Sequence, residues 1–286
     1  MEDQLEFFRK AQKISDEVMP FAKKLVKPDA KILDLAESIE SKIKELGGKP
    51  AWPVNISMNE IAAHYTPEAN EASVLNEGTL VKMDIGVQVN GCSWDRAFSV
   101  FVGKKLHALI EASEKALEKA LKLMKAGTKV FEISEVTENT VNDLGFNVVR
   151  NLSGHGIEQH HQHAHPSIPN SRNTIQDELE SGKVYAMEVF TTNGSGVVIE
   201  SSPTSIFKYH DDKPVRLWEA RKILEIAKNE FDQLPFCRRW IKGISAVKMD
   251  IALKQLAEVY AIETFPPLKE QSNGLVAQTE ETVIIE

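Results

Sequence analysis

The chain has 286 residues, of which 42% are hydrophobic and 27% charged, and its formal net charge is −8. This length allows one large domain or two ordinary ones, each with a sizeable core. The acidic balance and the lack of a long lysine or arginine run argue against nucleic acid as the main partner, because phosphate backbones attract clustered basic side chains.

The cysteine content and the chain start indicate the compartment. Cys92 and Cys237 are the only cysteines, so the sequence predicts neither a disulfide framework nor a thiolate zinc site. The first residues, MEDQLEFFRKAQK, lack the apolar core of a signal peptide, and no window approaches 18 uninterrupted apolar residues. We expect a cytoplasmic protein without membrane contact, and a monomer.

Helices and strands alternate in blocks along the chain. Apolar spacings of three and four predict a helix over 3–26, which Pro20 is expected to kink, and a second over 32–46, ended by Gly47-Gly48. Strands are expected over 81–102, 146–155, 183–192 and the C-terminal GLVAQTEETVIIE, and further helices over 104–126 and 130–144. The order of two helices followed by strands occurs twice, which suggests an internal pseudo-two-fold repeat. Residues 204–264 turn helical without a chemical motif and are interpreted as an inserted subdomain.

The stretch from Val81 to Val102 is typical of a β-hairpin with Asn90-Gly91 at its turn. In that register Gly86 faces Asp95 and Asp84 faces Ala97. The two aspartates then share one face as diagonal neighbours, about 7–8 Å apart at Cα. Such a pair can bind two metal ions, but it can equally be solvated, and a bulge would reverse the parity.

Other candidate ligands lie far along the chain. Five of the eight histidines fall within residues 155–165, and His155 has a glycine on either side. Glu188 interrupts an apolar strand, which is costly unless the carboxylate is paired, binds metal or faces water at an edge strand. Of the adjacent Glu280 and Glu281, one should face the core, and the pattern alone does not say which. These oxygen and nitrogen donors suit a pair of divalent ions.

In this order, Asp84, Asp95, His155, Glu188 and Glu280 resemble the five-ligand dinuclear site of the methionine aminopeptidase/prolidase superfamily, the "pita-bread" enzymes. More narrowly, the chain resembles the short type II methionine aminopeptidases. The stretches that carry the resemblance span nearly the whole chain: NISMNEIAAHYTP, VKMDIGVQVNG, NLSGHGIE, HAHPSIPN, MEVFTTNGSGVV, FPPL and VAQTEETVIIE. The helical block lies where type II enzymes carry their insertion.

The resemblance implies an α+β pita-bread fold, in which helices flank a pseudo-two-fold antiparallel sheet within one catalytic domain, 1–286. It implies that the five residues hold two divalent ions (Co, Mn, Fe or Zn) and that AQTEET selects Glu280 over Glu281. The remaining implied roles are catalysis by His64, His163 and Glu188, and methionine binding by Trp52, Gln162, Phe190 and Phe265.

The expected function is removal of the initiator methionine from nascent chains, with ribosome association as an accompanying expectation. Several residues depart from the family pattern: Gln162 stands at an apolar pocket position, His165 at a glycine, Arg96 follows Asp95, and Thr279 and Glu281 flank Glu280. These departures keep open the alternative of a catalytically silent binding protein of the same fold. A prolidase-like X-Pro peptidase, which needs the same metals, is a second alternative. Strand parity predicts that Arg96 points away from the aspartates.

Overall fold

The computed structural model describes residues 2–103, 107–231 and 233–286. Within these residues a nine-stranded antiparallel sheet has the order β1-β4-β5-β15-β9-β7-β8, with β2 paired to β4 and β6 to β9. The bounds of its strands are β1 (Lys49–Pro50), β2 (Asn55–Met58), β4 (Leu80–Val89), β5 (Cys92–Phe101), β6 (Asn147–Val148), β7 (Ser153–Glu158), β8 (His161–Pro169), β9 (Val184–Thr192) and β15 (Val276–Ile284).

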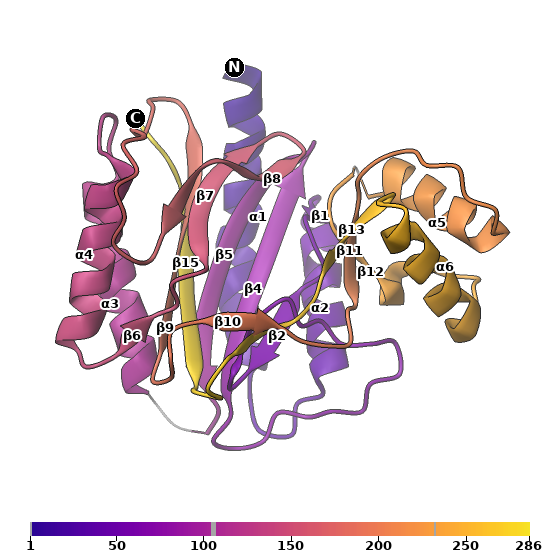
Figure 1. Cartoon of the computed structure of the whole chain (residues 1–286), viewed down its shortest axis with the longest axis horizontal. Helices are drawn as coiled ribbons and strands as arrows, with labels where there is room; N and C mark the ends of the chain where they lie inside the picture. Colours follow the sequence, from indigo (N-terminus) through magenta and orange to yellow (C-terminus); the bar gives the residue numbers. More distant parts are fainter. Residues whose placement is uncertain (1, 104–106, 232) are drawn as a thin grey trace.

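Two pairs of helices cover one face of this sheet (Figure 1). Helices α1 (Glu2–Leu25) and α2 (Ile32–Glu45) pack on β4 and β5, and α3 (Ala108–Leu123) and α4 (Val130–Asp143) pack on β9. The helix predictions are confirmed, except that residues 104–106 of the third lie outside the described part of the chain. Pro20 lies within α1, and Gly47, with φ of +89°, follows the end of α2 as expected of a helix C-terminus.

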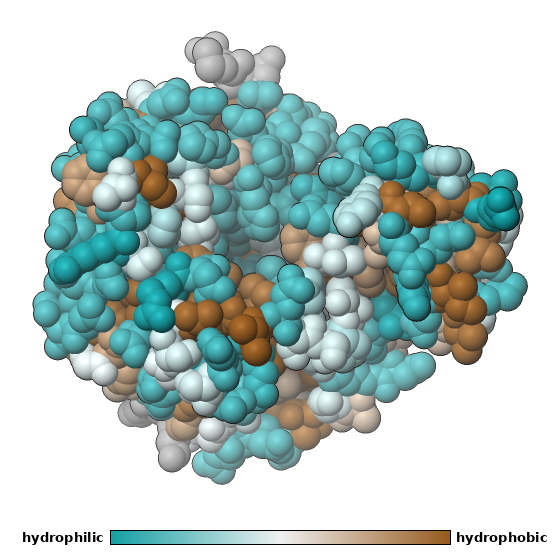
Figure 2. All heavy atoms as spheres, in the orientation of Figure 1, coloured by the Kyte–Doolittle hydropathy of each residue, from teal (hydrophilic) through white to brown (hydrophobic). Residues whose placement is uncertain are grey.

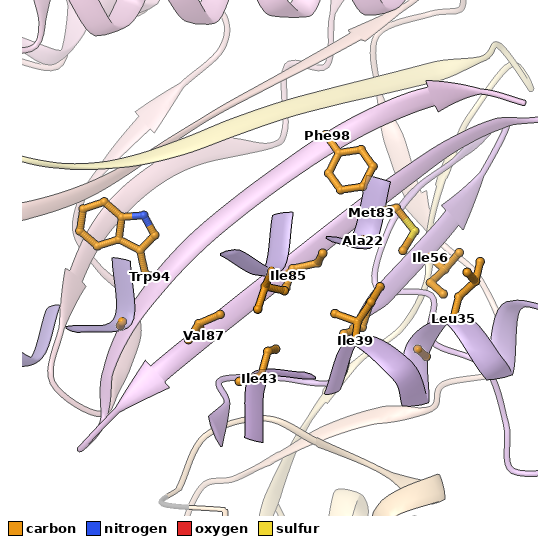
Figure 3. Packing of buried hydrophobic residues seen from close by; sticks show 14 of the residues in the cluster. Ala22, Leu35, Ile39, Ile43, Ile56, Met83, Ile85, Val87, Trp94 and Phe98 are labelled. Carbon is orange, nitrogen blue, oxygen red and sulfur yellow. The ribbon is translucent and has the colours of Figure 1, made fainter. Parts of the chain in front are cut away.

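The strand period decides which side chains form the core. Met83, Ile85 and Val87 of β4 point toward the helices and pack with residues such as Ile39 and Ile43 of α2 (Figure 3). Because successive side chains alternate, Asp84 and Gly86 point to the opposite face of the sheet. Because the apolar residues of β4 must face the helices, Asp84 must lie on the opposite face of the sheet.

A separate lobe follows residue 204. It contains β11 (Ile206–Tyr209), α5 (Trp218–Asn229), β12 (Phe236–Cys237), a 3₁₀ turn η1 (Arg238–Trp240), α6 (Ala246–Glu258) and β13 (Ile262–Phe265). Both helices are as the sequence pattern predicts, but the pattern missed the sheet β12-β11-β13 in this part of the described chain. The lobe has a hydrophobic cluster of its own, which Phe207, Leu253 and Leu256 help to form.

A second small sheet lies over the open face of the main sheet, with the order β10-β14-β3. Its strands are β3 (Ile61–Ala63), β10 (Val198–Glu200) and β14 (Leu268–Glu270). Figure 2 shows a hollow between the main body and the α5–α6 lobe, bordered largely by hydrophilic residues. Among the described residues, no helix has both the length and the apolar character needed to cross a bilayer.

Candidate metal centre and substrate pocket

The hairpin of β4 and β5 has the register that the sequence predicts. Gly86 pairs with Asp95 and Asp84 with Ala97, while the turn residues Asn90 and Gly91 have φ of +52° and +77°. Positive φ at both turn positions is the signature of a type I′ turn. Asp84 and Asp95 therefore lie on one face, and both line the same cavity.

Strands β9 and β15 bring two glutamates to this face. Glu188 lies directly across from Glu280, and β9 is flanked by β15 and β7, so Glu188 does not lie on an edge strand. The choice between the two C-terminal glutamates is also clear in the structure. Glu280 is 4% exposed and faces the cavity side, whereas Glu281 accepts a bond of 2.5 Å from Arg96 on the helix side.

Arg96 points away from the aspartates, as strand parity predicts. Its Nε lies 2.5 Å from Glu281 Oε1 and its Nη1 lies 2.6 Å from Asp16 Oδ1 of α1. The cation next in sequence to Asp95 is thus paired with two other carboxylates, and it does not oppose a metal on the other face.

His155 completes the group from strand β7, which lies between β9 and β8. Its Nε2 lies 3.8 Å from Asp95 Oδ2, and one ligand atom each from Asp95, His155 and Glu280 lie within 4.8 Å of one another. Gln278, two residues before Glu280 on the same face, donates from Nε2 to Glu280 (3.2 Å) and to Glu188 (3.4 Å). Its amide therefore holds the two glutamates side by side.

Without a bound cation, the surroundings of the four carboxyl groups favour their uncharged forms. Burial raises the pKa of Asp84 to about 6, although Trp52 Nε1 donates to its Oδ1 at 2.9 Å. Burial and neighbouring carboxylates also raise the pKa values of Asp95, Glu188 and Glu280. Like charges in a dry site disfavour ionisation, and cations reverse this effect.

The donor set fits divalent cations. Asp95 Oδ1 and Glu280 Oε1 are buried without a hydrogen-bond partner, and no lysine or arginine of the described residues pairs with any of the four carboxylates. Unpaired buried carboxylate oxygens are costly unless a cation meets them. Carboxylate and imidazole donors are typical ligands of Mn, Fe, Co and Zn.

The centre opens into a cavity of about 70 Å³. Ten of the eleven residues predicted for the site line it, and the eleventh, Glu280, lies beside Asp95 and His155. The lining consists of Trp52, Asn55, Ala63, His64, Asp84, Asp95, Leu152, His155, Gln162, His163, Glu188, Phe190, Ile206, Pro235 and Phe265. Surface clefts of about 610 and 630 Å³ are larger, but in the described residues no group of three ligating side chains lies at either.

Trp52 forms one wall because Gly86 leaves room for its ring. A Cβ at Gly86 would lie 2.4 Å from Trp52 Cε2 and Cζ2. The same indole reaches Asp84 through Nε1, so the apolar wall and one carboxylate are fixed by a single side chain. Ile206, Pro235 and Phe265 complete the pocket from the lobe side.

Two histidines, His64 and His163, line the cavity together with Phe265. His64 packs edge-to-face on Phe265 at 5.6 Å, and His163 lies 4.6 Å from His155 between ring centres. Burial lowers the pKa of His64 to about 4 and lowers that of His163, where His155 and His64 add to the effect. Both rings are therefore neutral near pH 7. His64 Nδ1 donates to the Pro266 carbonyl (3.2 Å), which leaves its Nε2 as an acceptor.

Sequence reasoning missed two polar residues of this region, Asn55 and Gln278. Gln278 could have been found from the same period of two that relates it to Glu280 and Thr282. Asn55 lies directly across from Asp84 in β2, and its pairing follows from a strand that the sequence pattern does not delimit. His165, by contrast, is exposed and bonds to Asp177 at 3.0 Å outside the cavity.

A pita-bread sheet carrying a buried cluster of carboxylates and one histidine defines the class, a hydrolase that uses divalent metal. Residues 6–205 match metallopeptidase family M24, and the chain belongs to this family. The fold predicted from the resemblance is thereby confirmed.

Individual relatives agree with this placement. A protein of Thermococcus onnurineus named methionine aminopeptidase is 46% identical over 286 residues, which is 99% of this chain and 97% of that protein. Among solved structures, a thermophilic Arx1 superposes with a TM-score of 0.87 at 17% identity, covering 99% of this chain and 88% of that one. A methionine aminopeptidase of Thermotoga maritima superposes with a TM-score of 0.72 at 21% identity, covering 100% and 94%. At these identities the two structures support the fold alone.

Proposed function

We propose that this protein is a methionine aminopeptidase, which removes the N-terminal methionine from newly made polypeptides. The observation that carries the proposal is that the candidate metal ligands lie next to an apolar pocket. The candidate ligands Asp84, Asp95, His155 and Glu188 line a small pocket walled by Trp52, Phe190 and Phe265, with Glu280 beside Asp95 and His155, and the size of this pocket suits one flexible thioether side chain. The full-length relative at 46% identity bears the same functional name.

The five residues Asp84, Asp95, His155, Glu188 and Glu280 would hold two divalent ions of Co, Mn, Fe or Zn. When bound, such ions would lower the pKa of a bound water and polarise the carbonyl of the scissile bond. Glu188 is the proton acceptor for the attacking water, and Gln278 orients its carboxylate. His163 donates to the carbonyl oxygen as negative charge develops there, and one such donor is worth roughly 3–4 kcal/mol in other hydrolases.

His64 acts at the nitrogen side of the scissile bond. Because its Nδ1 proton is held by the Pro266 carbonyl, its Nε2 lone pair faces a substrate as an acceptor for the amide N–H. Trp52, Gln162, Phe190 and Phe265 surround the methionine side chain. The whole chain acts as one catalytic domain, with residues 204–264 as an inserted subdomain that contributes Ile206 and Pro235 to the pocket.

A direct assay tests the proposal. The protein is stripped of metal, supplied with Co²⁺ or Mn²⁺, and incubated with the peptide Met-Ala-Ser. Release of free methionine is expected. The absence of release with every divalent ion tried would reject the function and favour a catalytically silent binding protein of this fold, which the intact ligand set argues against.

A prolidase-like activity on X-Pro bonds is the second alternative, because it would need the same ligands. Comparison of Met-Ala-Ser with Ala-Pro separates the two activities in one experiment. The resemblance to type II enzymes in AAHYTP and in the inserted block favours methionine. A cytoplasmic monomer that meets its nascent substrates at the ribosome completes the proposal, and size-exclusion chromatography and ribosome co-sedimentation test those two parts.

A further inference from the structure

One polar side chain among those that surround the substrate side chain takes no part in the bond cleavage described above. Gln162 of β8 is 3% exposed and lines the cavity, and its Oε1 has no hydrogen-bond partner. An unpaired amide atom in a buried position costs about 1–3 kcal/mol. The amide also has an NH₂ group, and a half-turn about its terminal bond presents either group to the cavity.

Several other polar side chains of the cavity have a hydrogen-bond partner or a place in the candidate metal cluster. Asp95 and His155 belong to the candidate metal cluster, Glu188 is paired with Gln278, and His64 is held by Pro266. Asn55 also has an unpartnered Oδ1, but it lies directly across from Asp84, at the carboxylate side, and its NH₂ donates to the Pro53 carbonyl. Gln162 is thus the uncharged polar group left to meet a side chain that enters the pocket.

The remaining walls are apolar: Trp52, Leu152, Phe190, Ile206, Pro235 and Phe265. A wholly apolar substrate side chain that fills such a pocket leaves the Gln162 amide dehydrated and unpaired. A side chain of the same length with a polar group at its δ position pairs with one end of this amide. A donor at that position meets Oε1 as it stands, and an acceptor meets Nε2 after the half-turn. Sites that contain a buried polar group discriminate strongly in favour of substrates that pair with it.

We infer that Gln162 is a specificity-determining residue, which adapts the pocket to N-terminal residues with an unbranched side chain and a polar δ group, and methionine sulfoxide above all. The sulfoxide oxygen would accept a hydrogen bond from Gln162 Nε2, while the methionine thioether is only a weak acceptor. The inference rests on the proposed aminopeptidase function and concerns the same pocket. It makes oxidised N-terminal methionine a substrate of the same hydrolysis.

The test compares kcat/KM for three peptides, X-Ala-Ser, in which X is norleucine, methionine or methionine sulfoxide. Norleucine has the length of methionine without a polar atom. The wild-type protein is compared with Gln162→Met, which conserves volume, and Gln162→Leu. The matched control is Gln176→Leu, because Gln176 is exposed and its side chain bonds to Lys129 and Thr174 outside the cavity.

We expect the sulfoxide-to-norleucine ratio of kcat/KM to fall about tenfold or more in both Gln162 variants, the size of one buried hydrogen bond, and to stay within twofold in the control. A ratio within one protein does not depend on the fraction that is active, so partial misfolding does not mimic the result. An unchanged ratio in the Gln162 variants would overturn the inference.

A binding experiment on the wild-type protein gives a result even if a variant fails to fold. The affinities of free methionine sulfoxide and free norleucine for the metal-loaded protein are measured by calorimetry. We expect free methionine sulfoxide to bind more tightly than free norleucine, by up to about tenfold for one buried hydrogen bond, whereas equal binding or any preference for norleucine contradicts the inference. If no peptide of any kind is cleaved, the proposed function fails, and this binding ratio still decides the role of Gln162.

Discussion

At the scale of single residues, the site depends on which of two neighbouring carboxylates faces the cavity. Glu280 lies beside Asp95 and His155 and is held by Gln278, while Glu281 lies on the helix side and pairs with Arg96. The two residues have the same chemistry and differ only in direction. They therefore form a matched pair for an experiment.

We expect Glu280→Gln to weaken the binding of Mn²⁺ or Co²⁺ by at least about a hundredfold, because changes even in groups that only support metal ligands cost 10–100-fold. Glu281→Gln should leave metal affinity within a few-fold and reduce stability by about 1 kcal/mol through its bond to Arg96. Calorimetric titration of the metal-free proteins measures both affinities. Equal losses in the two variants would show that the assignment of Glu280 is wrong.

At the scale of elements, a carboxylate fastens the loop after β9 to β14. Glu270 is fully buried and accepts bonds from Ser195 Oγ (2.7 Å), Ser272 Oγ (2.8 Å) and the backbone N–H groups of Gly196, Ser272 and Gly274. Burial alone would raise its pKa, but these donors outweigh burial and lower the pKa to about 2. The contact fixes the end of the strand that carries Glu188 and Phe190.

The lowered pKa of Glu270 has a defined effect on stability. The folded pKa of about 2 lies below the ordinary value of 4.5, so the contribution is complete above about pH 4.5 and is lost as the pH falls toward 2. This shift corresponds to roughly 3 kcal/mol. We expect Glu270→Gln to lower the free energy of unfolding by about 2–3 kcal/mol at pH 7, and the difference from wild type should shrink below pH 4.

Urea unfolding at several pH values between 3 and 7 measures that difference. The control is Glu200→Gln, since Glu200 is exposed at the end of β10, which pairs with β14. It should change stability by less than about 0.5 kcal/mol at every pH. A difference for Glu270→Gln that does not vary with pH would contradict the proposed contact.

A buried ion pair joins the 204–264 lobe to the main body. Arg239 donates from Nη1 and Nη2 to the two oxygens of Glu40 in α2, at 2.7 and 2.8 Å, and from Nε to the Pro67 carbonyl at 3.1 Å. Both side chains are nearly inaccessible to solvent. Trp240 Nε1 donates to the same carboxylate at 2.9 Å, so Glu40 accepts hydrogen bonds from two consecutive residues of the lobe, Arg239 and Trp240.

Breaking this pair on one side should be costly because it leaves a buried charge unpaired. We expect Arg239→Met to lower the free energy of unfolding by about 3–5 kcal/mol, and the double change Glu40→Met with Arg239→Met to lower it by less. A double-mutant cycle by chemical denaturation gives the coupling energy. If the two single losses simply add in the double variant, the pair does not hold the lobe in place.

At the scale of the whole molecule, local pattern was a good guide to the elements that have strong periodicity or turn signals. The hairpin register followed from Asn90-Gly91 and two alternating runs, and the helices followed from apolar spacing. Short strands such as β11 to β13 have only two to four residues, and their pairing partners are distant in sequence, so no local signal marks them.

The site was predictable to the extent that its residue types are unusual in their surroundings. Glu188 in an apolar strand and the five histidines within residues 155–165 were visible in the sequence. Which of Glu280 and Glu281 faces the cavity, by contrast, could not be decided from the residues themselves, because the two are adjacent and identical. The decision needed either the resemblance to a known family or the pairing with strand β9. The free amide of Gln162 is visible only once the pocket around it is formed.

The central claim is that the cluster of Asp84, Asp95, His155, Glu188 and Glu280 supports metal-dependent release of N-terminal methionine. The measurement that tests it most directly titrates Mn²⁺ or Co²⁺ into the metal-free protein and follows methionine release from Met-Ala-Ser at each ratio of metal to protein. The account predicts negligible release without metal, recovery that saturates by two ions per chain, and little cleavage of Ala-Pro. Release that is unaffected by metal removal, or a preference for Ala-Pro over Met-Ala-Ser, would contradict it.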